Sequence, residues 1–232
     1  MRNMRLRKHL LGLIAVIAAL VTMWFTLDRA IIYIVSRSYN LSIDYDGLKN
    51  EHFRHFTFKD LSAIDNRRGL GFKSGYAKLN LIGIKGLSAA TCEFELHNVS
   101  LIKKGESALD RYGDIAGLVS APFASRWRYK DVIGRVRLFG KGIVVEKFKA
   151  ESEDIKLSLS GTILSDDTLT CDLIIYFSEA LTGNIPEELS EVVLRNESNG
   201  WKSLSVKLTG NYRSPSIQVA GQMFRLNIKE VS

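Results

Sequence analysis

Beyond residue 40, hydrophobic and polar residues alternate along most of the chain with a period of two. In the segment 169–177, every second residue is apolar, so these side chains share one face of an extended strand. The alternation recurs along the chain and predicts a series of strands that each have one apolar face. The positions of this predicted apolar face are Phe56, Phe58, Leu79, Leu81, Cys92, Phe94, Leu96, Val136, Leu138, Ile155, Leu157, Leu159, Leu169, Cys171, Leu173, Ile175, Phe177, Leu204, Val206 and Leu208.

Residues that favour turns separate the predicted strands. They lie at 65–69, 83–86, 140–142 and 165–167, where Gly, Asp, Asn or Ser are concentrated. The strands follow one another without the helices that alternate with strands in a parallel sheet. The sequence therefore predicts a mainly β protein built as an antiparallel meander.

Two segments depart from the alternation. Residues 106–119 are expected to form a short amphipathic helix or an ordered loop, and residues 187–195, after Pro186, a helix. One or two short helices cover little of a sheet, so its apolar face must be buried in another way. The sheet can close into a barrel, pack as a sandwich, or curl into a groove that holds something apolar, and the pattern does not choose among these.

The N-terminal segment has a different pattern. Residues 10–27 contain no charge and would span about 27 Å as a helix, close to the hydrocarbon thickness of a bilayer. Four basic residues precede them, which places the N-terminus in the cytoplasm and the rest of the chain across the membrane. The alternative is a cleaved signal peptide, but the apolar run is long and ends in Met-Trp-Phe, so we expect an uncleaved anchor.

The composition indicates a folded domain with one attached segment. Of the 232 residues, 46% are hydrophobic and only 3 are Pro, which excludes a disordered chain. The net charge of +7 belongs mostly to residues 1–39, because residues 40–232 are close to neutral. No nucleic-acid partner is expected, since such a partner requires a basic face.

The sequence offers no constellation for catalysis. It contains no Walker or GxSxG pattern and no His-rich zinc motif, and His52 and His55 would point to opposite faces of a strand. We therefore expect neither an enzyme nor a bound cofactor or metal ion. Cys92 and Cys171 share the apolar face, so they form either a disulfide or two buried thiols. The strict geometry of disulfides favours the thiols.

The last third of the chain carries a more specific pattern. Gly161-Thr162-Ile163-Leu164 precedes an apolar strand, and Gly183-Asn184-Ile185-Pro186 precedes a short acidic helix. A final strand pair then contains Gly210-Asn211 and Ser214-Pro215-Ser216-Ile217. This order resembles the C-terminal region of AsmA-like proteins, although Gly210-Asn211 stands where that family has a second Gly-Thr.

The resemblance implies a location and a function. AsmA-like proteins are anchored in the bacterial inner membrane and hold a curled antiparallel sheet in the periplasm, and the larger members are regarded as lipid-transfer bridges. It implies a single-pass inner-membrane protein, with residues 1–39 as the cytoplasmic flank and signal anchor and residues 40–232 as a periplasmic β domain. The predicted apolar face would then line a groove for membrane lipids in transport or envelope homeostasis.

A structural role is the alternative. The small inner-membrane component of type II secretion (GspN-like) has a similar layout of one anchor and a β domain. In that reading the apolar face is filled by its own side chains, and open strand edges pair with other envelope proteins.

Overall fold

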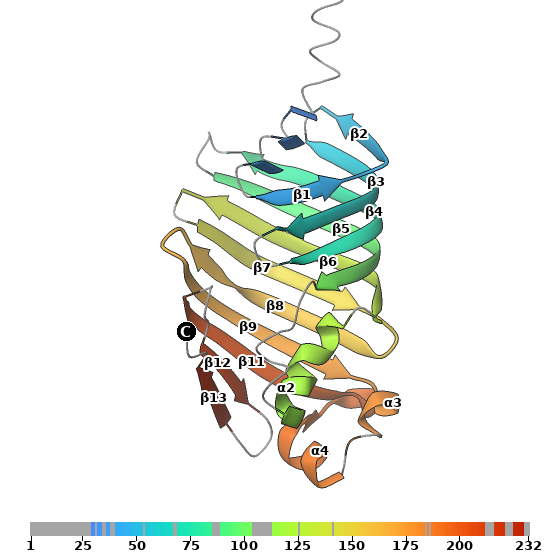
Figure 1. Cartoon of the computed structure of the whole chain (residues 1–232), viewed down its shortest axis with the longest axis vertical. Coiled ribbons are helices and arrows are strands. Elements are labelled where there is room, and N and C mark those ends of the chain that lie inside the picture. The colour runs from blue at the N-terminus through green and yellow to red at the C-terminus, as the bar shows by residue number, and fades with distance from the viewer. Residues whose placement is uncertain are drawn as a thin grey trace, which may run out of the picture.

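The computed structural model of the chain describes residues 29–229, except 31, 34–35, 38–39, 53, 67–68, 85–88, 104–112, 125, 141, 184, 186, 212–215 and 221–224. Thirteen strands of this part form one sheet (Figure 1). The strands are β1 (Leu41–Asp44), β2 (Gly47–Glu51), β3 (His55–Asp65), β4 (Leu70–Ile84), β5 (Ala89–Lys103), β6 (Arg128–Phe139), β7 (Gly142–Glu151), β8 (Ile155–Leu164), β9 (Thr168–Phe177), β10 (Arg195–Asn196), β11 (Lys202–Asn211), β12 (Ser216–Ala220) and β13 (Arg225–Lys229).

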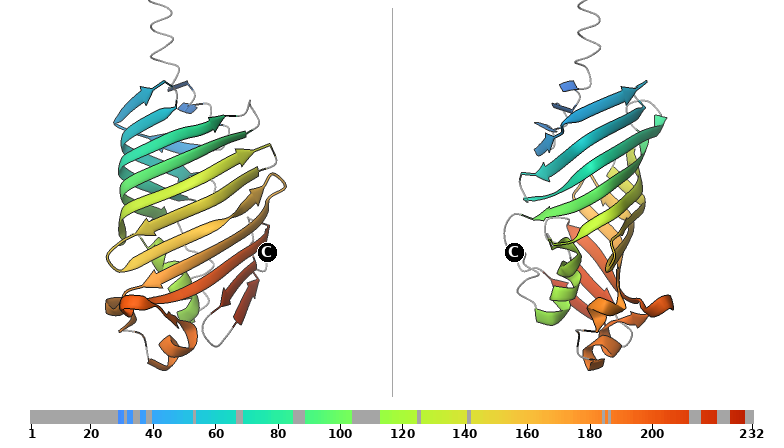
Figure 2. Two further views of the ribbon diagram at one scale, coloured as in Figure 1. Left: turned by 180° about the vertical axis from the view of Figure 1, so that it is seen from behind. Right: turned by 90° about the vertical axis from the view of Figure 1, so that its right-hand side faces the viewer.

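The sheet is a meander in which sequence neighbours pair side by side. The order is β1-β3-β4-β5-β6-β7-β8-β9-β11-β12-β13, while β2 also pairs with β3 and β10 with β11. The prediction of a mainly β, antiparallel fold is confirmed, because these pairings are antiparallel from β1 through β13. Within the described residues β1 does not pair with β13, so the sheet is open and curls around its inner face (Figure 2). The structure thus decides against the closed barrel and the sandwich.

Short helices lie at one end and on the inner side of the sheet. They are α2 (Gly113–Ser120), the 3₁₀ turn η3 (Ala121–Phe123), α3 (Glu179–Thr182), α4 (Glu187–Val193) and the 3₁₀ turn η4 (Ser198–Gly200). The helix expected within 106–119 is present from Gly113 onward. The expected helix 187–195 ends earlier, at Val193, because Arg195 pairs with Ser203 and begins β10.

The predicted membrane anchor, residues 10–27, lies outside the described residues. In the part of the chain that is described, no helix combines the length and the apolar character needed to cross a membrane.

The register places the predicted apolar positions on one face. Phe56 is the neighbour of Leu79, which is also the neighbour of Phe94. Further along the sheet, on the same face, Leu159 lies beside Leu173, and Leu173 lies beside Val206. Rows of apolar side chains therefore run across the strands, along the long axis of the molecule. We call this face the inner face.

The alternation is shifted along one line that crosses four adjacent strands. There the register is kept, but two consecutive residues in each strand face away from the inner side. Asp60 and Asn98 lie on this line with φ of 49° and 54°, a conformation that Asp and Asn tolerate better than most residues. As a result, the buried residues on either side of the line are three apart instead of two. They are Phe58 and Leu61, Ser74 and Ala77, Leu96 and Val99, and Tyr129 and Val132.

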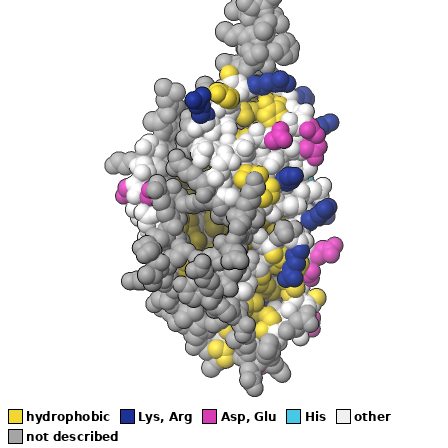
Figure 3. All heavy atoms as spheres, viewed as in Figure 1, with side chains coloured by type: hydrophobic (Ala, Val, Ile, Leu, Met, Phe, Trp, Pro, Cys, Tyr) yellow, Lys and Arg dark blue, Asp and Glu magenta, His cyan; other side chains and the backbone are white. Residues whose placement is uncertain are grey.

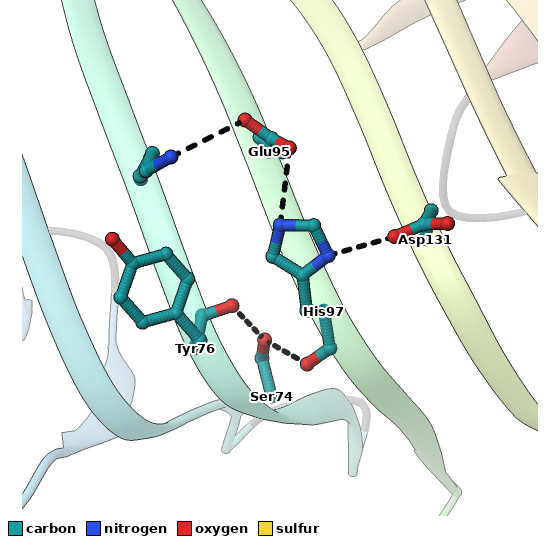
Figure 4. A network of polar contacts seen from close by, with 6 residues as sticks. Ser74, Tyr76, Glu95, His97 and Asp131 are labelled. Atoms are coloured by element: carbon teal, nitrogen blue, oxygen red, sulfur yellow. Dashed lines mark hydrogen bonds and ion pairs between the residues drawn. The ribbon is translucent and has the colours of Figure 1, made fainter.

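Ser74 compensates for the interrupted ladder at this line. Its buried hydroxyl lies 2.7 Å from the carbonyl oxygen of Tyr76 and 2.9 Å from that of His97, and its single proton serves both acceptors (Figure 4). Buried carbonyl groups need such a partner, since an unsatisfied one costs about 1–3 kcal/mol. A serine in an otherwise apolar face is therefore explained by the backbone irregularity beside it.

Candidate functional site: an apolar cavity on the inner face

A cavity of about 570 Å³ lies on the inner face. Its lining comes from strands β1 and β3 to β9, with one residue before β1 and one from η3. These eight strands cover about 34 Å along the sheet at about 4.8 Å per strand. The lining residues are Ile32, Ile43, Phe58, Leu61, Ala63, Phe72, Leu79, Phe94, Leu96, Val99, Leu101, Phe123, Tyr129, Val132, Phe148, Ala150, Leu157, Leu159 and Leu173.

The lining residues that the structure describes carry no charge. Eighteen of these nineteen side chains are hydrocarbon, and the last is Tyr129. The Tyr129 hydroxyl donates a hydrogen bond of 2.8 Å to the carbonyl oxygen of Pro122, so it is already satisfied by the protein. Burial raises the pKa of Tyr129 far above its usual value, which keeps the group neutral. To an apolar ligand, the described lining therefore offers hydrocarbon surface without a competing polar group.

Gly134 shapes the middle of the cavity. It lies between Phe94 of β5 and Phe148 of β7 in one cross-strand row. A Cβ atom at Gly134 would lie 2.3 Å from Cζ of Phe94, so the absence of a side chain lets the Phe94 ring lie over β6. The two aromatic rings then approach to 6.3 Å between centroids. Glycine positions in sheets are often covered by an aromatic ring in this way.

Seven of the twenty predicted positions line the cavity: Phe58, Leu79, Phe94, Leu96, Leu157, Leu159 and Leu173. Ten others lie on the same face but outside the cavity. They are either in the half of the face that other parts of the chain cover or near the ends of the strands. These ten are Phe56, Leu81, Cys92, Val136, Ile155, Cys171, Ile175, Phe177, Leu204 and Val206. The remaining three, Leu138, Leu169 and Leu208, are near the turns of the sheet, and Leu138 is 43% exposed there.

Sequence reasoning missed twelve lining residues. Those around the shifted line, such as Leu61, Val99 and Tyr129, do not continue the period of two that the prediction followed. The signal that was present is a spacing of three with Asp or Asn between two apolar residues. Ile32 and Phe123 come from segments outside the strands, and only the tertiary structure brings them to the cavity.

The two cysteines are free thiols. Cys92 is on β5 and Cys171 on β9, so three strands separate them and no disulfide can form. Burial raises the pKa of both thiols, which makes them poor nucleophiles near neutral pH. The preference for free thiols is confirmed, with Cys171 buried and Cys92 only partly buried.

Charged side chains gather on the opposite, outer face. His97 lies between two carboxylates, with Nδ1 2.7 Å from Asp131 Oδ1 and Nε2 3.0 Å from Glu95 Oε1 (Figure 4). Further along the same two strands, Arg135 pairs with Glu93. The described residues contain no group of three or more His, Cys, Asp or Glu side chains that could hold a metal ion. These contacts form a partly exposed ion-pair network of the kind that contributes little to stability.

The space-filling view agrees with this division. Hydrophobic side chains gather in the hollow of the face seen in Figure 3, and charged side chains lie along its border. Comparison of the chain with protein-family models, with curated proteins and with solved structures finds no match.

Proposed function

We propose that this protein binds the acyl chains of a membrane lipid in the inner-face cavity and takes part in lipid transport at the membrane that anchors it. One observation carries the proposal: a cavity of about 570 Å³ whose described lining residues include no charged side chain. This volume lies in the range of small-molecule sites, about 300–1,000 Å³.

An apolar occupant is favoured on physical grounds. A bound water needs about two to four polar partners, and the lining provides only a hydroxyl that is already bonded to Pro122. An empty apolar space forgoes the dispersion contacts that a filled one makes. Burial of hydrocarbon contributes about 0.8 kcal/mol for each methylene group, so an acyl chain supplies ample driving force.

The position of the cavity favours a membrane as the source of the ligand. Its first lining residue, Ile32, follows the uncharged segment 10–27 by only five residues. Beside it, Tyr33 is 62% exposed and its hydroxyl accepts a hydrogen bond of 3.1 Å from Arg37. Tyrosine paired with a basic side chain is typical of the membrane–water interface. The resemblance to AsmA-like proteins supports the inner membrane and the periplasm as the location.

Photo-crosslinking in cells tests the proposal on the full chain. A benzophenone amino acid replaces Phe94 in the cavity, and in a matched control it replaces Ile133, which is 39% exposed on the outer face. Irradiation is followed by purification and mass spectrometry of the adducts. We expect lipid adducts at position 94 at a yield at least tenfold above that at position 133.

The alternative role gives a different result. If the protein is a scaffold of an envelope or secretion assembly, position 94 reacts only with this chain, and adducts with other proteins arise at the sheet edges. Equal lipid yields at positions 94 and 133 would show unspecific contact with the bilayer and would contradict lipid binding in the cavity.

A further inference from the structure

The inner face is open along only part of its length. Among the side chains that the structure describes, the cavity lining reaches β9 through Leu173 and includes none from β11 or β12. Yet the apolar rows continue, since Leu173 is followed by Val206 and then by Val219. The sheet itself therefore provides a surface that the cavity does not use.

The unused part is covered. Leu204 and Val219 have no exposed surface, and Val206 is 2% exposed. Figures 1 and 2 show α2 on the inner side of the sheet, over this half. Val119 of α2 is buried in the same hydrophobic core as these residues.

The junction between the open and the covered part is η3. Phe123 lines the cavity and is still 38% exposed, whereas Pro122 beside it is buried. The hydrogen bond from Tyr129 holds the carbonyl oxygen of Pro122 against β6. Because Tyr129 itself lines the cavity, this contact ties the end of α2–η3 directly to the cavity wall.

We infer that α2 and η3 close the cavity on the side of β9, so that the bound hydrocarbon ends at Phe123 and does not continue along the inner face to β13. This rests on the proposed function and refines it. The protein holds the acyl chains of a lipid in a closed-ended chamber and releases them at the open side. It is then a carrier or a presenter of lipid and not a conduit through which lipid flows from end to end.

The test uses further crosslinking positions in the full chain. The benzophenone amino acid replaces Leu79 or Phe148 in the chamber, and Leu208 or Ile217 on the same face beyond α2–η3. All four residues are partly buried, so the probes enter comparable surroundings. We expect lipid adducts at 79 and 148, and at least a tenfold lower yield at 208 and 217. At these two positions the probe should instead react within the chain.

Each outcome separates the two claims. Equal lipid yields at all four positions would overturn the closed end and leave lipid binding standing. No lipid at any of the four would overturn the proposed function itself. A second variant, Phe123→Ala, shortens the side chain at the closed end. If the ratio of lipid-adduct yields at positions 148 and 208 is unchanged, and neither position gains lipid, α2 is the main barrier. A fall of that ratio assigns the end to Phe123, and both results retain the closed chamber.

Discussion

Gly161 shows how tightly two strands approach within the sheet. It lies on β8 between Val145 of β7 and Cys171 of β9. A Cβ atom there would lie 2.4 Å from the carbonyl oxygen of Thr170 and 2.6 Å from Cα of Cys171. Both are backbone atoms, so a rotation of a side chain cannot relieve the contact.

We therefore expect Gly161→Ala to lower the free energy of unfolding by about 2 kcal/mol or more, as other overpacked sites do. Chemical unfolding followed by circular dichroism measures the effect. The matched control is Gly117→Ala, because Gly117 is inside α2 and a Cβ there would meet no atom within 4 Å other than its chain neighbours and the backbone of its own helix. Alanine there should leave the stability unchanged or raise it by up to about 1 kcal/mol. Equal effects at the two positions would contradict the close approach.

At the scale of elements, the attachment of η3 to β6 depends on one buried hydroxyl. Tyr129 is 1% exposed and its hydroxyl bonds to Pro122, seven residues earlier in the chain. The hydrogen bond therefore links η3, at the end of α2, to β6, the strand that follows in the chain. Loss of this hydroxyl leaves the carbonyl oxygen of the buried Pro122 without its donor, which costs about 1–3 kcal/mol.

Tyr129→Phe should reduce stability by that amount and also change its pH dependence. The folded-state pKa of Tyr129 is raised, so above pH 10 the unfolded chain loses this proton while the folded chain keeps it. Unfolding free energy then falls as the pH rises. The fall should be smaller in the variant but still present, since the pKa of Cys92 and Cys171 is raised as well. Urea unfolding at pH 8, 10 and 11 tests this.

The control for this experiment is Tyr176→Phe. Tyr176 lies on the outer face of β9, between Lys156 and Ser203. Its substitution should change stability by less than about 0.5 kcal/mol. If Tyr129→Phe has the same slope as this control, the buried hydroxyl is not the source of the alkaline instability.

For the molecule as a whole, one continuous sheet provides both the scaffold and the apolar surface proposed for lipid binding. Its outer face carries the charged rows, and its inner face carries the apolar rows. The helices cover one half of the inner face, and the apolar cavity lies in the other half. Lipid retention should therefore depend on the position of a substitution along this face and not only on its chemistry.

We expect Leu173→Asp to lower the lipid that co-purifies with the full chain at least tenfold, because it places a charge in the cavity lining. Leu138→Asp makes the same change on the same face but at an exposed position outside the cavity, and lipid content should be unchanged. Mass spectrometry of extracted lipids gives the ratio, with circular dichroism as the check on folding.

Ala63→Trp covers the case in which Leu173→Asp fails to fold. Ala63 lines the cavity and is only partly buried, so the larger side chain fills the space without adding a charge. Lipid content should fall in this variant also. Normal retention in both folded variants would show that the lipid binds elsewhere.

The sequence by itself determined the class of the fold and the face on which the site lies. Alternation with a period of two follows from strand geometry, so it identified the strands around Phe94 and Leu173 and placed their side chains together. Turn residues at 65–69 and 165–167 likewise set the antiparallel order. Local geometry alone is sufficient for these features.

Only the tertiary structure decided where that face is open. The shift at Asp60 and Asn98 brings Leu61 and Val99 to the inner face, because a backbone irregularity in one strand is matched in its neighbours. Phe123 lines the cavity and reaches it from a connection between strands. One half of the face is covered and the other is open because of contacts between residues far apart in the chain. A pattern confined to neighbouring residues does not contain these contacts.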